Sequence, residues 1–363
     1  MATNNDRFDY PTPSVNVATD TNPDRTAILV LDVPNGLDAG APKGTKPISP
    51  LQRALKLLLH DRRALFSLGV LFLFVAIALI GPSIYQHIGS IYTSDLVGPI
   101  GPTVYHQYAH EELSQQDALP SARYWLGTDS VGRDILARLM QGLLISLTVA
   151  VTVEIVNVTL GLLVGVLAGF YGGWIDFLLA RFTDLMFAFP SLLFAILLVG
   201  VFGPSANLFF SKVPLFGDAG NARLLVVSIA LAFTSWPMMA RYVRGQTLQI
   251  KEAQFIEASQ ASGTNTARLI MRHIIPHLLS IIFIASTLDI AGTITGEAGI
   301  SLLGLGVSDP GSSLGLMIAD SLDLADSHPW EVLVPTLALT IIVLAFSFLG
   351  DSLRDAFDPR SKR

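Results

Sequence analysis

The sequence predicts an all-α, polytopic membrane protein, a bundle of about six transmembrane helices. Hydrophobic residues make up 51% of the chain, charged residues 14%, and the mean hydropathy is +0.54. These values lie well away from those of soluble domains. Six segments are apolar enough to cross a bilayer, which takes about 17 to 25 helical residues. None shows the period-two alternation of an outer-membrane barrel, so helices are the spanning structure that fits them.

Composition also excludes several functions. The chain has no cysteine, which rules out disulfides, zinc-thiolate sites and thiol nucleophiles. The net charge of −6 comes without a basic face, so we expect no nucleic-acid partner. The first fifty residues show no cleavable signal pattern, and we expect the first span to act as its own uncleaved insertion signal.

Taken in order, residues 1–50 predict a disordered cytoplasmic tail, with a docked strand at 27–33 as the alternative. Residues 51–64 predict an amphipathic interfacial helix or an extension of the first span. The chain is then expected to form a first transmembrane helix at 65–84, an external loop at 85–140, a transmembrane core at 141–350 with a cytoplasmic loop at 241–277, and a cytoplasmic tail at 351–363. The expected spans are 65–84, 143–170, 177–201, 224–240, 278–294 and 332–349.

Positive charge predicts the orientation of these spans, because Lys and Arg gather in cytoplasmic loops. They cluster before the first span, between the fourth and fifth spans, and after the last one. The segment 301–331 has none and carries several Asp. Both termini and the loop 241–277 are therefore expected on the cytoplasmic side.

The polar stretch 252–277 predicts a helix, a hinge and a second helix. Good helix formers fill 252–261, and Gly263 offers the left-handed backbone that ends a helix. Asn265 and its threonine neighbours can cap the next helix. That helix is expected to stop at Pro276, which lacks an N–H. Such a shape on a membrane face suits docking into a partner.

Within this stretch, Glu257-Ala258-Ser259, Gly263 and Ile275-Pro276 resemble the "EAA" loop of permease subunits of bacterial binding-protein-dependent ABC importers. Ser259 replaces a usual alanine and Ile275 a usual leucine. In that family the loop forms coupling helices seated on an ATPase. An ordinary charged cytoplasmic loop is the alternative that spacing alone leaves open. The resemblance implies these ATPase-coupling residues: Glu257, Ala258, Ser259, Gly263, Arg272, Ile275 and Pro276.

Further blocks resemble the dipeptide, oligopeptide and nickel branch of the family. They are the run from Trp125 to Asp134, WLGTDSVGRD, and the segment from Glu297 to Val307. Read from the residues alone, the first block is a glycine-punctuated cap with an Arg–Asp pair, and the glycines of the second permit close helix approach or an irregular turn. The external or path-lining candidates are Gly127, Thr128, Asp129, Gly132, Arg133, Asp134, Glu297, Gly304 and Gly306.

Ionisable residues inside the predicted spans are Glu154, Arg181, Asp184 and Asp289. Such groups are costly in lipid and face the protein interior or water. For Glu154 we favour a structural hydrogen bond to a neighbouring helix over pathway lining. Arg181 and Asp184, three residues apart, are expected to pair. Pro190 is expected to bend its span.

Two histidine pairs, His106/His110 and His273/His277, have i,i+4 spacing. No third ligand is fixed for the first pair, and Ile274 stands where an H-E-x-x-H zinc protease needs Glu. We therefore predict no metal site and no intramembrane enzyme.

No G-x-x-x-x-G-K-[ST] phosphate loop occurs in the chain, so we expect a non-catalytic subunit that binds no cofactor. The resemblance implies ATP and Mg on two partner ABC ATPase subunits, a second related permease, an extracytoplasmic substrate-binding protein and a bacterial inner membrane with its lipid. Short peptides are the expected cargo, with nickel or oligosaccharide as alternatives. A different class, the ion-coupled secondary transporter, would also use intramembrane acids.

Overall fold

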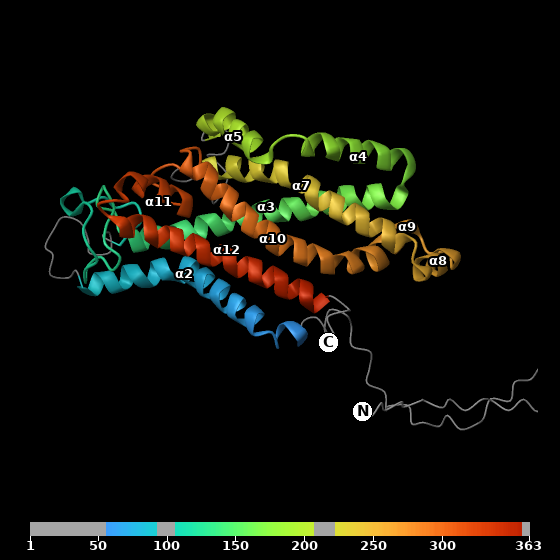
Figure 1. Cartoon of the computed structure of the whole chain (residues 1–363), viewed down its shortest axis with the longest axis horizontal. Coiled ribbons are helices and arrows are strands. Elements are labelled where there is room, and N and C mark those ends of the chain that lie inside the picture. The colour runs from blue at the N-terminus through green and yellow to red at the C-terminus, as the bar shows by residue number, and fades with distance from the viewer. Residues whose placement is uncertain (1–55, 93–105, 207–221, 358–363) are drawn as a thin grey trace, which may run out of the picture. The chain divides into compact units, whose positions relative to one another are not determined.

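A computed structural model describes residues 56–92, 106–206 and 222–357, and the expectations for the N-terminal tail and for 93–105 lie outside these residues. The predicted all-α fold class is confirmed, since no β-strand forms in the described ranges (Figure 1). The long helices are α2 (Arg62–Tyr92), α3 (Ile135–Tyr171), α4 (Gly173–Phe187), α5 (Ser191–Phe202), α7 (Ala222–Lys251), α10 (Ile275–Leu302) and α12 (Pro329–Phe357). The shorter elements are α8 (Gln254–Ala261), α9 (Thr266–Leu269), α11 (Leu314–Ser321), the 3₁₀ turns at Leu113–Gln115, Gly203–Ser205 and Leu322–Leu324, and a π-helical segment at Ile270–Ile274.

Among the described residues, five helical segments are long and apolar enough to cross a membrane, and a sixth span results if α4 and α5 count as one. These two helices meet at an angle of 77° across residues 188–190. Pro190 lies there, directly before the first residue of α5. Its missing N–H interrupts the helical ladder, as predicted.

Several helices run beyond the predicted spans. α2 covers 31 residues rather than the expected 20-residue core, and α7 and α12 continue through polar sequence to Lys251 and Phe357. The backbone hydrogen bonds of these helices continue past the last apolar residues. A run of apolar residues therefore predicts only the part of each helix that can lie in the bilayer. α3 begins at Ile135, because the Asp134 side chain accepts the free N–H groups of Leu136 and Ala137.

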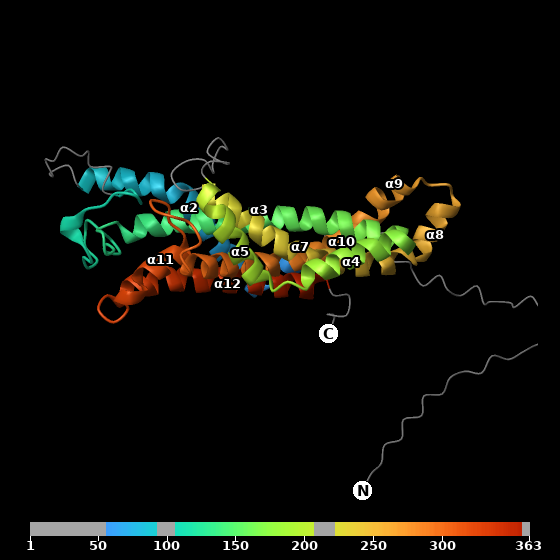
Figure 2. The same ribbon diagram turned by 90° about the horizontal axis from the view of Figure 1, so that it is seen from above.

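The described residues of the unit Ser49–Arg363 form one helical bundle. α3, α7 and α12 end, and α2 and α10 begin, toward the end that carries α8 and α9 (Figures 1 and 2). The opposite end carries residues 106–134, α11 and the start of α12. Lys251, Arg268, Arg272 and Arg354 thus lie toward the first end, the side that the charge pattern predicts to be cytoplasmic.

Close packing of α3 against α7 depends on three glycines spaced four residues apart, Gly161, Gly165 and Gly169. A Cβ on Gly165 would lie 2.7 Å from the Ala240 carbonyl oxygen, and a Cβ on Gly169 would lie 2.9 Å from the Arg244 carbonyl oxygen. Absence of side chains lets the two backbones approach, as small residues do in membrane helix pairs.

Replacing Gly165 with alanine is expected to destabilise the chain by about 1–3 kcal/mol, because the added methyl group overpacks this interface. The readout is the thermal unfolding midpoint of the detergent-solubilised chain. Gly245 on α7 is the matched control, since a Cβ there meets nothing within 4 Å. An unchanged midpoint for G165A beside an unchanged G245A would contradict the tight packing of α3 on α7.

Candidate functional site

The segment 252–277 folds as a short helical projection held by a buried anchor. Ile256 of α8 is fully buried and packs in one apolar cluster with Val243, Leu269 and Ile274. Gly263 has a φ of +78°, the left-handed conformation predicted for the hinge. The Asn265 side chain accepts the Ala267 N–H and caps α9, also as predicted. The projection therefore takes a fixed shape from its apolar side.

The predicted stop at Pro276 is wrong. The chain stays helical from Thr266 to Leu302, with a π-helical segment at Ile270–Ile274 before α10 begins at Ile275. Pro276 falls in the first turn of α10, where its missing N–H and fixed φ are tolerated. The wider π turn separates α9 from α10 without a break, and such turns recur at functional sites.

The outer side of α8 is free. Glu257 and Ala258 are exposed, and Phe255 is 44% exposed while its ring stacks on His277 at 5.1 Å. Ser259 is half-buried, and its hydroxyl donates to the Thr264 hydroxyl at 3.1 Å, closing the turn around the hinge. We call the exposed residues Gln254, Phe255, Glu257, Ala258 and Ala261 the α8 face.

Ion pairs fasten α4 to α7 near this end. Arg244 donates from Nε and Nη2 to the two oxygens of Asp176, at 2.5 and 2.8 Å. Asp184 accepts from Arg241 at 2.8 Å, while the predicted pair with Arg181 measures 3.7 Å and is exposed. The pairing of Arg181 with Asp184 is thus present, but the shorter contact of Asp184 joins two helices.

A groove of about 680 Å³ opens at the break between α4 and α5. Phe189 and Pro190 line it from the break, Thr234 and Ser235 from α7, and Asp289 from α10. Asp289 is therefore half-buried and lines the groove, rather than being enclosed in the helix bundle.

Glu154, another acid inside a predicted span, does not line this groove. Glu154 is buried with Ser286 and Asn157 beside it, yet neither carboxyl oxygen has a hydrogen-bond partner among the described residues. Asn157 does form an interhelical bond, accepting from the Ser235 hydroxyl at 2.8 Å.

Glu297 is fully buried and accepts from the hydroxyls of Ser146 at 2.8 Å and Ser301 at 2.7 Å. It thereby joins α3 to α10 rather than lining the groove.

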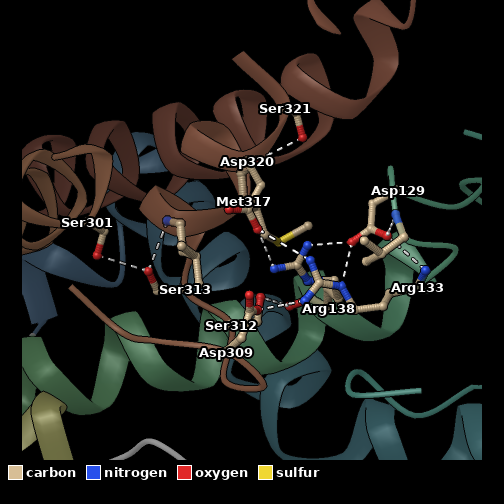
Figure 3. A network of polar contacts seen from close by, with 12 residues as sticks. Asp129, Arg133, Arg138, Ser301, Asp309, Ser312, Ser313, Met317, Asp320 and Ser321 are labelled. Carbon is tan, nitrogen blue, oxygen red and sulfur yellow. Dashed lines mark hydrogen bonds and ion pairs between the residues drawn. The ribbon is translucent and has the colours of Figure 1, made fainter. Parts of the chain in front are cut away.

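At the opposite end, a network of ion pairs forms around the buried carboxylate of Asp129 (Figure 3). Its carboxylate accepts from Arg133 Nε at 2.8 Å and from Arg138 Nη1 at 2.5 Å. Arg133 reaches Asp309 at 2.6 Å and Arg138 reaches Asp320 at 2.9 Å. Segments almost two hundred residues apart are thus joined through two guanidinium groups, which favour planar multi-donor pairing.

Neighbouring carboxylates stabilise the protonated, positively charged form of the Arg133 guanidinium. Burial by itself lowers the pKa of this guanidinium, but the carboxylates of Asp129 and Asp309 outweigh burial and raise the pKa above its ordinary value. We call Asp129, Arg133, Arg138, Asp309 and Asp320 the outer ion network.

Neighbouring signature residues build the loop that holds this network. Thr128 is fully buried, accepts the Ala118 N–H at 2.9 Å and donates to the Gln115 carbonyl. Gly132 has a φ of +79°, and a Cβ there would lie 1.9 Å from the Glu112 carbonyl oxygen. Asp134 also accepts from the Tyr85 hydroxyl and from His106, both at 2.8 Å. The His106 ring is therefore bound to a buried carboxylate.

Gly127 and Gly304 have positive φ values of 81° and 72° at turns. Gly306 lies against Ser301, where a Cβ would come within 2.6 Å of the Ser301 Cα. The glycines of both signature blocks thus occupy turns and close approaches, as the residue types suggest.

A family model described as "Binding-protein-dependent transport system inner membrane component" matches residues 161–363. A second, "N-terminal TM domain of oligopeptide transport permease C", matches residues 49–99. The chain belongs to the binding-protein-dependent transport family. As an inner-membrane component of such a system it is an inner-membrane protein.

Relatives are similar over most of their length. The dipeptide transport system permease protein DppC of Alkalihalophilus pseudofirmus is 34% identical over 315 residues, 87% of this chain and 91% of the relative. The oligopeptide transport system permease protein OppC of Escherichia coli K12 is 35% identical over 311 residues, 86% and 91% respectively. A solved MetNI methionine ABC transporter aligns at 21% identity over 60% of this chain and 95% of its own, with a TM-score of 0.47.

Three residues of the outer ion network in this inner-membrane component are not among the sites predicted from the sequence. Arg138 is 2% exposed and central to the outer ion network, yet it sits in the first turn of an apolar helix without a motif around it. Asp309 and Asp320 read as ordinary loop acids. No spacing pattern in the sequence indicates these three residues. The four-residue spacing of Gly161, Gly165 and Gly169 is a recognisable pattern, but it indicates close helix packing rather than a functional site.

Proposed function

We propose that the chain is one of two related permease subunits of an ATP-driven importer, and that it translocates short peptides delivered by an external binding protein. The observation that carries this proposal is the α8 face, exposed outward while Ile256 is fully buried on the opposite side. A short helix with a rigid base and a free face is suited to dock into a groove. Peptide cargo is supported by the dipeptide and oligopeptide relatives.

The projection is connected to the groove by a continuous helical path. α9, the π-helical segment and α10 lead from Thr266, three residues after Gly263, to Asp289 without a break. Displacement of α8 by a partner ATPase is therefore transmitted along α10 to the groove wall. For this to drive transport, the ATPase must bind the inward- and outward-open states with different affinity, because equal affinity shifts no population.

The proposal places both termini and the α8 face on the cytoplasmic side, with ATP and Mg bound by the partner ATPases. The second permease is expected to cover the groove beside Asp289 and complete the path. The outer ion network and the loop 106–134 then face the external binding protein. Nickel or oligosaccharide cargo would leave this assembly unchanged, since the binding protein selects the substrate.

A second candidate is an ion-coupled secondary transporter, favoured by two carboxyls in spanning helices, Glu154 and Asp289. Reconstitution in proteoliposomes separates the two. We expect peptide uptake to require ATP and copurified ATPases, and to persist when an ionophore dissipates the proton gradient. Uptake driven by a proton gradient without an ATPase would overturn the importer.

A further inference from the structure

Three potential metal ligands converge at the end of the bundle opposite α8. Asp117 follows the 3₁₀ turn at Leu113–Gln115, while His328 and Glu331 flank the start of α12. One ligand atom from each of the three lies within 4.8 Å of the other two. More than two hundred residues separate the two segments in sequence, and both occur at the same end in Figures 1 and 2.

Burial makes this cluster unusual. Glu331 is 2% exposed, and neither of its carboxyl oxygens has a hydrogen-bond partner among the described residues. Asp117 is half-buried, and its Oδ1 atom is buried without a partner in the same part of the chain. The Asp129 carboxylate also lies nearby, but Arg133 and Arg138 already balance its charge. Buried carboxylates without donors are strongly disfavoured unless a cation or a proton compensates them. Two of them side by side point to a missing positive charge.

We propose that Asp117, His328 and Glu331 bind a divalent transition-metal ion, with Zn²⁺ as the best match. One imidazole nitrogen and two carboxylates form a ligand set that Zn²⁺ accepts, at about 2.0–2.2 Å per bond. The Ser327 hydroxyl lies 3.0 Å from His328 Nδ1, which leaves Nε2 as the free ring nitrogen and orients the ring. A water completes four-coordination.

The site ties the external loop to α12 next to the outer ion network. The Asp117 N–H donates to the Asp129 carbonyl oxygen at 3.0 Å, so a metal held by Asp117 also restrains the residue that both guanidinium groups share. A metal ion here would close the outer end of the chain, whatever the direction and substrate of transport.

The test is Zn²⁺ binding to the full-length chain in detergent after stripping with EDTA. We expect one Zn²⁺ per chain by calorimetry, a higher unfolding midpoint with Zn²⁺, and reversal by EDTA. Glu331→Gln keeps the side-chain volume and should weaken Zn²⁺ binding by more than the ~10–100-fold typical of losing a second-shell group. His328→Ala should do the same.

His60→Ala is the matched control, because His60 is exposed and bonded to the Lys56 carbonyl oxygen near the other end; it should bind Zn²⁺ as wild type does. Folding of each variant is checked by a cooperative melt without metal. Wild-type affinity in a folded E331Q, or absence of saturable Zn²⁺ and Mn²⁺ binding by the wild type, would overturn the site and assign the missing charge to a proton shared by Asp117 and Glu331.

Discussion

Replacing Asp129 with asparagine is expected to destabilise the outer end of the bundle by about 3–5 kcal/mol, the cost typical of breaking a buried ion pair. The Asp129 carboxylate is shared by Arg133 and Arg138 and accepts the backbone N–H groups of Val131 and Arg133 at 3.1 and 2.8 Å. Asparagine removes the negative charge and directs an N–H₂ group toward two guanidinium groups. The measurement is the shift in unfolding midpoint of the solubilised chain.

Asp323→Asn provides the control for this change, because Asp323 is an exposed acid at the same end. Its effect should stay within about 0.5 kcal/mol, as for most surface substitutions. If D129N and D323N unfold at the same temperature, the outer ion network contributes nothing to stability and our assignment of Asp129 as its centre fails.

Gly263→Val is expected to reduce ATP-coupled uptake about 10-fold or more. A β-branched residue at a φ of +78° carries roughly 1–2 kcal/mol of strain, and every 1.4 kcal/mol corresponds to about a tenfold change in an equilibrium. Relief of that strain tilts α8 relative to α9 and moves the α8 face out of register with the ATPase. Uptake and ATP hydrolysis are measured together in proteoliposomes, where hydrolysis should continue without matching transport.

Gly263→Asn is the matched variant for the hinge. Asparagine tolerates the left-handed conformation, and a Cβ at this position meets nothing within 4 Å. G263N should therefore transport nearly as well as wild type. Equal, wild-type uptake in both variants would show that the fixed angle between α8 and α9 has no part in coupling.

Much of the fold could be read from local sequence. Runs of apolar residues located five helices long enough to cross a bilayer, because burying a helix in lipid demands apolar side chains over a bilayer's width. The predicted span 177–201 is instead the bent pair α4 and α5. Pro190 predicted the bend and Gly263 predicted the hinge, because the backbone preferences of proline and glycine depend little on the surrounding structure. Helix ends were less predictable: Pro276 reads as a stop, yet in the first turn of α10 it costs no hydrogen bond.

Some features of the candidate site could likewise be predicted from local sequence, and others could not. The sequence by itself determined the fold class, the family and the hinge at Gly263, all of which depend on residues close in the chain. Only the tertiary structure decided that Arg138 shares Asp129, that Glu297 is packed between helices rather than lining the groove, and that Asp117 meets Glu331. Contacts across hundreds of residues leave no periodic or spacing signal, because they arise when separate helices pack together.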